Sequence, residues 1–474
     1  MLEWSATDLS RVIHARKVAP SEVMAVWLAQ VGAMNGAVNA LVSLRDADAL
    51  MAEARALDDV APQGWLHGIP FAVKDLVATK GLRTTWGSPI WADHVPVADD
   101  ILAARMRAAG AIFAGKTNVP EWGQGSHSFN PIFGVTRNPY DLSRSAGGSS
   151  GGAAAALATR MAWVADGSDM MGSLRNPAGF CNVYGFRPSW GLVPSDAEGD
   201  TYLSTLSTEG PMARTVEDLA RLLLVQAGEN PEVPFPRAVP DLLTGLERGV
   251  KGLRIGWLAD WGGAYPMEPG ILDCCKAGLA VLEGLGAHIE PLPPPFSSEK
   301  LWQAWVTLRA MLNAGGKRAL AEDPAKRALT KPETLWEIEQ GLGLAAQDIY
   351  EASVTRSRWH ADAARLFQCY DAVVLPTAQV WPFPADWRWP EEIDGRKMDT
   401  YHRWMEVVVP ASLIGLPALS VPAGFSPGGL PCGMQIIGRS GNDAGVLGIG
   451  QAYHRATEWP QRRPPALAAV PVSG

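Results

Sequence analysis

The pattern of hydrophobic and polar positions changes between helical and strand spacing along the first third of the chain. Apolar residues recur with helical spacing in four stretches: 6–16, 21–34, 46–58 and about 99–109. Pro20 and Ser21 are expected to open the second helix, with Ser21 as its cap. Short apolar runs at 69–74 and 111–115 are typical of strands. A strand, a helix and a strand in this order predict a β-α-β unit in a helix-covered sheet.

The same alternation continues through the rest of the chain. An amphipathic helix is expected over 212–228, with Thr215 as its cap, and residues 295–370 are mostly helical. The other expected elements are a strand at 252–258, a helix at 270–285, strands at 371–378, 418–425 and 433–439, and a helix at 445–456. No internal repeat or long low-complexity linker divides the chain. We therefore expect one large α/β domain over 1–474, a helical insertion near 295–370 and a frayed tail from 459.

A glycine-rich stretch at 146–156, AGGSSGGAAAA, places Ser149 and Ser150 between pairs of glycines. The alanines that follow predict a buried helix, so the two serines belong to a turn at a helix N-terminus. Three interpretations are open from these residues. The turn packs a helix, or it binds phosphate, or it carries a nucleophile. No G-x-x-x-x-G-K-[ST] match supports phosphate binding, while GGSSG fits the loose G-x-S-x-G pattern of a nucleophile elbow.

Two further segments contain candidate functional side chains. In GIPFAVKD (68–75), Ile69, Phe71 and Val73 alternate with smaller residues, and Lys74 ends this apolar run. A lysine in that position is usually a surface residue whose stem packs on apolar neighbours, although a buried amine fits the same pattern. In GSDMMGSLRNP (167–177), Ser173 follows a glycine and stands between an aspartate and an arginine.

The order of these three segments resembles the amidase signature family. Lys74 and Ser149 are 75 residues apart, and Ser149 and Ser173 are 24 apart. Other strings that match the family are GKTNVPEWG (115–123), NPIFGVTRNP (130–139) and GLPCGMQIIGR (429–439). The similarity covers nearly the whole chain, with a signature core at about 66–200. It implies an α/β fold whose central, mixed, twisted sheet is covered by helices on both faces.

The resemblance also implies hydrolysis of amide bonds in small molecules through an acyl-enzyme intermediate. Ser173 would be the nucleophile, Ser149 the bridging serine and Lys74 the base, with a cis peptide bond between Gly148 and Ser149. A free lysine has a pKa of ~10.4 and is protonated at neutral pH. Burial disfavours the ammonium form, and a pKa of ~7 requires about 4–5 kcal/mol of differential destabilisation. The apolar strand that ends at Lys74 is a suitable setting.

The resemblance assigns the oxyanion hole to the backbone N–H groups of Met170, Met171, Gly172 and Ser173. Relatives commonly have T-G-G here, so the two methionines depart from the family pattern. The side chain at Met171 either narrows the acyl side of the pocket or fills the core.

Neighbouring residues would support these groups. Asp169 and Arg175 are expected to hold the loop, unless they form an ordinary surface ion pair. Ser150 is expected to assist backbone hydrogen bonding near Lys74.

Two segments are candidates for substrate binding. Residues 122–126, WGQGS, align with a stretch that lines the acyl pocket in the family, so Gly123, Gln124 and Gly125 are expected to bind substrate; a plain turn is the alternative. A loop at 380–395 is rich in tryptophan and proline, and such loops often line binding sites. The hypothesis is that some of four tryptophans form an aromatic wall for the substrate: Trp381, Trp387, Trp389 and Trp404.

Within the family, the strings DMMGSLRNPA and CNVYGFRPS are similar to aryl-acylamidases, nylon-oligomer hydrolases and urethane-splitting amidases. We therefore expect activity on small aryl amides, esters and carbamates. Three alternatives are kept: the amidase subunit of a tRNA-dependent amidotransferase, a non-enzymatic binding protein, and an α/β-hydrolase-type esterase that uses Ser149. The esterase would need a histidine partner from a small set: His288, His360, His402 and His454.

Composition narrows the remaining choices. The net charge of −8 over 474 residues argues against a nucleic-acid partner. We expect no signal peptide and no membrane span, because no apolar stretch approaches 18 residues. The five scattered cysteines indicate free thiols in a reducing compartment, so a cytoplasmic location is expected. No metal-ligand cluster is visible and no cofactor is expected. The expected partner is a small-molecule amide or carbamate, and a homodimer stays open.

Overall fold

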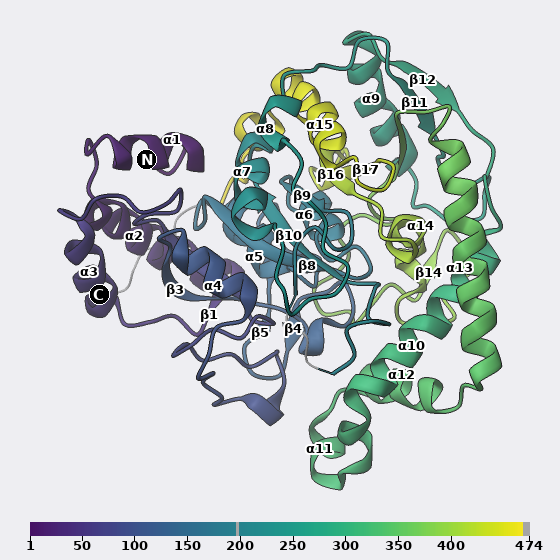
Figure 1. Cartoon of the computed structure of the whole chain (residues 1–474), viewed down its shortest axis with the longest axis horizontal. Coiled ribbons are helices and arrows are strands. Elements are labelled where there is room, and N and C mark those ends of the chain that lie inside the picture. The colour runs from purple at the N-terminus through teal and green to yellow at the C-terminus, as the bar shows by residue number, and fades with distance from the viewer. Residues whose placement is uncertain (196–198, 468–474) are drawn as a thin grey trace.

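The computed structural model describes residues 1–195 and 199–467, and a mixed eight-stranded sheet lies at its centre (Figure 1). From one edge to the other the strands are β12 (His288–Pro291), β11 (Arg254–Trp257), β13 (Ala372–Pro376), β17 (Pro431–Ile437), β16 (Ala418–Phe425), β9 (Tyr184–Arg187), β10 (Thr208–Ala213) and β8 (Val164–Asp169). The first three strands are parallel to one another, and the other neighbours pair antiparallel. The expected mixed α/β sheet is confirmed.

Both faces of this sheet are covered by hydrophobic core, because side chains alternate in direction along each strand. In β13, Ala372 and Val374 belong to one cluster of buried residues, while Val373 and Leu375 belong to another. Successive side chains of a strand point to opposite faces, so the two clusters mark the two sides. Three helices contribute to the first cluster: α7 (Val216–Gln226), α9 (Ile271–Gly284) and α15 (Asp443–Thr457). The second includes α10 (Ser298–Glu322), α13 (Ala346–Leu366) and α14 (Val409–Leu413). Helices therefore cover both faces, as expected.

A second, three-stranded sheet carries the expected β-α-β unit. Its strands are β1 (Leu41–Val42), β3 (Ile112–Thr117) and β2 (Pro70–Lys74), and α4 (Ile101–Ala108) connects the parallel pair β2 and β3. The N–H group of Lys74 donates to the Asp166 carboxylate of β8, at 3.0 and 3.2 Å from its two oxygens. This contact brings the end of β2 to the edge of the large sheet.

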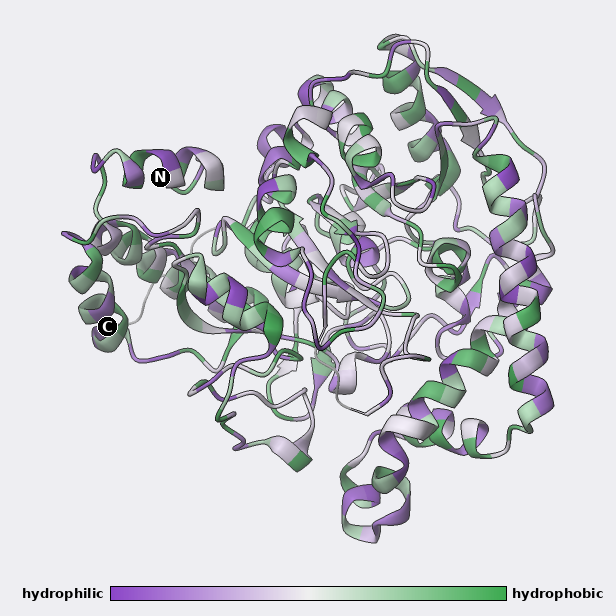
Figure 2. Cartoon of the chain, in the orientation of Figure 1, coloured by the Kyte–Doolittle hydropathy of each residue, from purple (hydrophilic) through white to green (hydrophobic). Residues whose placement is uncertain are grey.

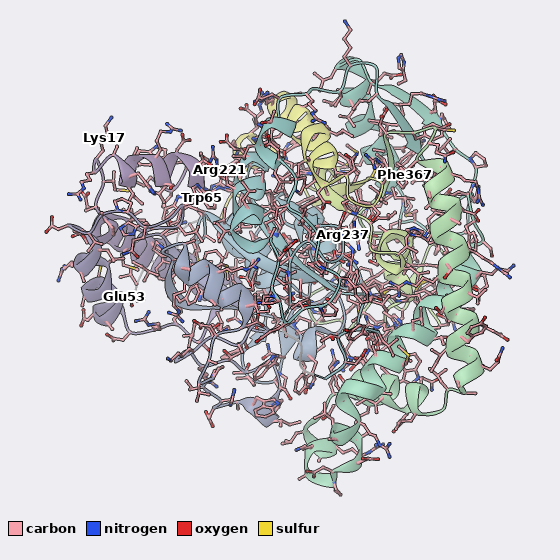
Figure 3. All side chains as sticks on the ribbon, in the orientation of Figure 1. Lys17, Glu53, Trp65, Arg221, Arg237 and Phe367 are labelled. Carbon is pink, nitrogen blue, oxygen red and sulfur yellow. The ribbon has the colours of Figure 1, made fainter. Side chains whose placement is uncertain are left out.

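The N-terminal helices are α1 (Ala6–His14), α2 (Pro20–Val38) and α3 (Ala47–Leu57). The expected cap of α2 is wrong, because the helix already begins at Pro20 and Ala19 occupies the cap position. Ser21 instead binds Asp58 through its N–H and its hydroxyl, at 2.9 and 2.7 Å. Beside α1, Trp65 and Arg221 lie close together in Figure 3 and line a surface hollow of about 470 Å³.

Two other expected elements are corrected. The helix expected over 212–228 begins at Val216, because the Thr215 hydroxyl caps it by accepting the Asp218 N–H at 3.1 Å. Met212 and Ala213 belong to β10, which the hydrophobic pattern did not predict. The strands β8, β9 and β12 were missed as well. The prediction of a frayed tail from 459 is wrong for the part of the tail that the structure describes, which ends at residue 467. Within it, α16 (Trp459–Arg462) is docked by Asn182, whose amide donates to the Trp459 carbonyl at 3.1 Å. Residues 468–474 lie outside the described part of the chain.

The helical region near 295–370 contains α10, α11 (Pro324–Leu329), α12 (Pro332–Leu342) and α13, which lie along one side of the molecule (Figure 1). Hydrophobic and hydrophilic residues alternate around these helices (Figure 2). The apolar side of α10 buries Trp302 and Trp305. None of the helices in the described ranges is long and apolar enough to cross a membrane.

Candidate active site

Three segments that are distant in sequence converge at the candidate site. Lys74 ends β2, Ser149 and Ser150 precede α5 (Gly151–Ala158), and the third segment follows β8. Every residue of α5 is buried, as the alanine run predicted. A Cβ at Gly152 would lie 2.3 Å from the backbone nitrogen of Asn118, at the end of β3. A glycine is therefore required for the helix to pack this closely against the strand that adjoins Lys74.

The amine of Lys74 is surrounded by three serine hydroxyls. Its Nζ lies 2.9 Å from Ser149 Oγ, 2.8 Å from Ser150 Oγ and 2.9 Å from Ser168 Oγ. The side chain is 0% exposed, so a surface role for this lysine is excluded. A neutral amine has two N–H donors and one lone pair. Three hydroxyl neighbours satisfy it fully when two accept its hydrogens and one donates to the lone pair.

Burial lowers the pKa of Lys74 to about 8, against the opposing effect of the carboxylates of Glu209, Asp166 and Asp169. The direction agrees with the expectation from the apolar strand, because an ammonium ion in a dry site loses its hydration. Burial also raises the pKa of Asp166 to about 6, although its carboxylate accepts the backbone N–H of Lys74. A substantial fraction of the amine is therefore uncharged slightly above neutral pH.

The peptide bond between Gly148 and Ser149 is cis, as the family resemblance implied. Ser126 holds this bond from one side, since its Oγ donates to the Gly148 carbonyl and accepts the Gly148 N–H at 3.3 Å. Ser128 Oγ accepts the N–H of Gly151 at 3.1 Å. Two serines from one neighbouring loop thus fix the turn that presents Ser149 to Lys74.

Asp169 and Arg175 form a buried ion pair, so the surface alternative is wrong. The Arg175 guanidinium reaches the two oxygens of Asp169 at 2.9 and 3.0 Å, and Arg187 approaches Oδ1 at 3.3 Å. All three side chains are fully buried. Burial alone would raise the pKa of Asp169, but the two guanidinium groups and the Gly172 N–H hold that pKa below its ordinary value. These contacts fix the loop between β8 and α6 (Arg175–Phe180).

The structure revises the expected oxyanion hole at one position. The N–H of Gly172 already donates to Asp169 Oδ1 at 2.8 Å, so it is not available to a substrate oxygen. Gly172 has φ +81°, a conformation that favours glycine and lets this amide turn back toward Asp169. In residues 1–195 and 199–467, the N–H groups of Met170, Met171 and Ser173 have no protein acceptor. These three amides remain candidates.

A cavity of about 120 Å³ adjoins these groups. Ser149, Ser168 and Ser173 line one part of it, together with Met170 and Met171. The Ser150 N–H donates to the Ser173 carbonyl at 3.3 Å and so ties the two serine segments together. Met171 is also part of the second hydrophobic cluster, so it both borders the cavity and fills the core.

The expected substrate-binding residues Gly123, Gln124 and Gly125 all line this cavity. They also form a turn, in which Gly123 has φ +68° and a Cβ there would lie 2.7 Å from Leu76 Cδ1. The side-chain amide of Gln124 is held by the helical region, since its Nε2 donates to Asn313 Oδ1 at 2.9 Å. Gln124 therefore connects the cavity wall to α10.

A second wall of the cavity was missed in the sequence. Arg309, Asn313 and Lys317 of α10 line it. Their spacing of four residues places them on one helix face, a signal that the sequence contained. Ser168 was missed too, although it directly precedes Asp169 in the motif. Burial lowers the pKa of Lys317 to about 8, and its Nζ donates to Asn313 Oδ1 at 2.6 Å.

The prediction of an aromatic wall is wrong, because none of the four tryptophans lines the cavity. Trp404 is buried in the core, where it stacks on Phe180 with ring centroids 6.5 Å apart. Trp381 donates to the Pro269 carbonyl at 3.1 Å, Trp389 packs edge-on against Tyr401, and Trp387 is exposed. Trp404 thus belongs to the second hydrophobic cluster and Trp389 packs against it, whereas Trp381 packs against the first. The tryptophan that lines the cavity is Trp122.

The histidines proposed as partners in an esterase do not approach Ser149. His288 and His360 are exposed, and His454 Nδ1 lies 3.0 Å from the Tyr184 hydroxyl. His402 lies in a neighbouring cavity. Among the described residues no group of three histidine, cysteine or carboxylate side chains is arranged to hold a metal ion. The groups that meet at Ser149 are the amine of Lys74, the neighbouring serine hydroxyls and the backbone amides.

An α/β fold that buries a lysine among serines beside a cavity defines a class of amide hydrolases. The chain belongs to the amidase family, whose sequence model matches residues 22–447. It is 32% identical to an acylamidase of Rhodococcus erythropolis over 98% of both chains. It is 34% identical to a glutamyl-tRNA(Gln) amidotransferase subunit of Moorella thermoacetica, over 97% of this chain and 98% of that one. The structure of a bacterial aryl acylamidase of the amidase signature family superposes with a TM-score of 0.90, at 29% identity, covering 98% of this chain and 99% of the other.

Proposed function

We propose that this amide hydrolase acts on small molecules through Ser173, Ser149 and Lys74. The observation that carries the proposal is the buried amine of Lys74, 2.9 Å from Ser149 Oγ at the wall of a cavity that Ser173 also lines. A lysine acts as a base only when its pKa approaches the working pH, and burial lowers the pKa of Lys74 to about 8.

In the proposed first step, Ser173 Oγ attacks the carbonyl carbon of the substrate. Its proton passes to Ser149, whose own proton passes to the neutral amine of Lys74. A tetrahedral intermediate forms, and its oxyanion accepts hydrogen bonds from the free N–H groups in the set Met170, Met171 and Ser173. The ammonium of Lys74 then returns a proton through Ser149 to the leaving nitrogen, the C–N bond breaks and the acyl-enzyme remains. Water attacks the ester by the same proton path and regenerates Ser173.

The proposed substrates are aryl amides, with aryl esters and carbamates (urethanes) as further substrates. The similarity to an aryl acylamidase and to an acylamidase supports the aryl amides. An ester or carbamate passes through a tetrahedral intermediate of the same shape and charge, so the same groups serve it. The apolar part of the cavity wall consists of Leu76, Trp122, Met170, Met171 and Met405.

A second candidate function, as one component of an amidotransferase, is favoured by the 34% identity to a subunit of such an enzyme. That role would require glutamine, whose α-ammonium group needs a carboxylate partner in a dry site. The described residues that line the cavity include the cations Arg309 and Lys317, which suit the α-carboxylate of glutamine, but no aspartate or glutamate for its ammonium group. This charge distribution favours an acyl-amide substrate without a free ammonium group. Turnover by the isolated chain, with no partner protein, would distinguish the two functions.

The test compares three substrates on purified protein: a nitroanilide, an aliphatic amide and an aryl carbamate. We expect the nitroanilide to be hydrolysed, and Lys74→Ala, Ser149→Ala and Ser173→Ala each to lower kcat by at least about 10³-fold. Ser357→Ala, on the exposed side of α13, is the matched control. Near-full activity in any one of the first three variants would refute the role given to that residue.

A further inference from the structure

A second cavity, of about 310 Å³, lies next to the serine-lined cavity on the other side of Arg309. Residues of α10, α12 and the segment 399–402 line it, and Arg309 belongs to the walls of both cavities. Three of its lining residues have aromatic rings: Trp302, Trp336 and His402. Trp336 is 37% exposed, so the cavity reaches the surface there, whereas Trp302 and His402 are buried.

His402 has an unusual position in this cavity. It is 1% exposed, and neither of its ring nitrogens has a hydrogen-bond partner within the described ranges. Burial, reinforced by Arg309 and Arg403, lowers the pKa of His402 well below its usual value, so the ring is neutral. A neutral imidazole offers one N–H donor and one nitrogen acceptor. The buried hydroxyl of Thr400 also lacks a partner. Polar groups of this kind in a folded interior are nearly always satisfied, so the cavity is equipped to hydrogen-bond to an occupant.

The surroundings of His402 favour a flat and uncharged occupant. The ring centroid of Trp302 lies 5.0 Å from that of His402, and Trp336 faces it edge-on at 6.1 Å. The carboxylate of Glu337 is already engaged by Arg309 at 2.8 Å and by the Tyr401 hydroxyl. The third charged residue of the lining, Asp399, lies 3.7 Å from the Arg403 guanidinium. Each charged side chain that lines the cavity therefore has a partner of opposite charge. Aromatic walls with a few convergent polar groups are typical of small-molecule sites.

We infer that this cavity is a second binding site, which takes a small neutral aromatic molecule with one hydroxyl or amino group, such as a phenol or an aniline. The ring packs between Trp302 and Trp336, and its polar group bonds to His402. An apolar cavity of about 150 Å³ holds benzene, so the observed volume accommodates a substituted ring. The inference rests on this cavity alone, and it stands whether or not the chain cleaves aryl amides.

Calorimetric titration of the full chain with phenol and with toluene tests the inference. Because phenol has a group that bonds to His402, we expect it to bind about tenfold more tightly than toluene, which corresponds to one net hydrogen bond. His402→Phe keeps a ring against Trp302 but removes both nitrogens. In this variant the preference for phenol should disappear while toluene affinity changes by less than about threefold.

Val306→Trp fills the cavity without touching the serine-lined one, because Val306 lines only the former. It should abolish binding of both ligands, whereas Arg318→Trp, on the exposed side of the same helix, should leave binding unchanged. Unchanged phenol binding in Val306→Trp, equal affinity for phenol and toluene in the unmodified chain, or no binding of either ligand would overturn the inference. If Val306→Trp does not fold, as judged by circular dichroism, the comparison of the two ligands in His402→Phe decides.

Discussion

Lys74 Nζ lies 2.9 Å from Ser149 Oγ, and both side chains are shielded from solvent. The chain brings them together from 75 positions apart by ending β2 beside the turn that begins α5. This arrangement links two properties that are often considered separately. The same burial that fixes the distance between the two atoms also removes water from the amine and lowers its proton affinity.

A pH dependence follows directly from this arrangement. Lys74 accepts a proton only in its neutral form, so kcat/KM should rise with pH and level off above a midpoint near the Lys74 pKa of about 8. The measurement is hydrolysis of an uncharged amide between pH 5 and 10. Lys74→Met, which keeps the length and apolar stem, should lose at least about 10³-fold in rate across the range. A rate that stays constant from pH 6 to 9 would contradict the assignment of Lys74 as the base.

The hydroxyls of Ser150 and Ser168 should orient the lone pair of the amine. They lie 2.8 and 2.9 Å from Lys74 Nζ, so they accept its two hydrogens and leave the lone pair for Ser149. Replacing either serine by alanine should lower kcat by about 10- to 100-fold with little change in KM, because proton transfer is affected more than binding. Steady-state kinetics of both variants, with Ser357→Ala as the control, measure this. A change in KM alone would show that the hydroxyls act on the substrate instead.

The family resemblance of three strings implied that Lys74, Ser149 and Ser173 meet at one site, and the alanine run after Ser149 predicted a buried helix. The alanine run is a local signal, because it depends on residue types within a dozen positions. The meeting of segments 75 and 24 residues apart is not local, and only the resemblance implied it. The direction of the Lys74 pKa shift could be argued from the apolar strand alone, whereas Ser168 could not be found without knowing that β8 ends beside it.

Long-range packing explains what the sequence did not reveal. The 380–395 loop has the composition of a binding surface, but Trp389 packs against the hydrophobic core and Trp404, which follows the loop, is buried in that core. The role of Gly172 depended on which acceptor its amide faces, and that acceptor is the buried carboxylate of Asp169. The wall formed by α10 depends on how a helix some 140 residues later docks against the serine segments. None of these outcomes is determined by local propensity.

The buried pair of Asp169 and Arg175 should be a major contributor to stability. Asp169→Asn would leave Arg175 and Arg187 without a carboxylate, and removing one partner of a buried ion pair costs about 3–5 kcal/mol. Because the folded state lowers the pKa of Asp169, its stabilising contribution is present above the ordinary pKa and is lost as pH falls below it. Urea unfolding of the variant at pH 7 measures the free-energy change.

The control for this prediction is Arg318→Ala, since Arg318 and Glu322 form an exposed pair on α10. An exposed pair contributes at most about 1 kcal/mol, so this variant should unfold close to the unmodified chain. Equal unfolding free energies for Asp169→Asn and the unmodified chain would contradict the structural role of the buried pair.

Met171 should set the size limit of the acyl group. Its side chain borders the cavity of about 120 Å³ and also packs in the second hydrophobic cluster. Met171→Ala should therefore enlarge the cavity, raise kcat/KM for bulky acyl groups about tenfold relative to acetyl, and cost about 2 kcal/mol of stability, the low end for such truncations. A series of anilides with acyl chains of increasing size, together with urea unfolding, measures both effects. Met398→Ala is the control, because Met398 packs against the same cluster but does not line this cavity. If both variants keep the acyl preference of the unmodified chain, Met171 serves the core alone and the size limit lies elsewhere.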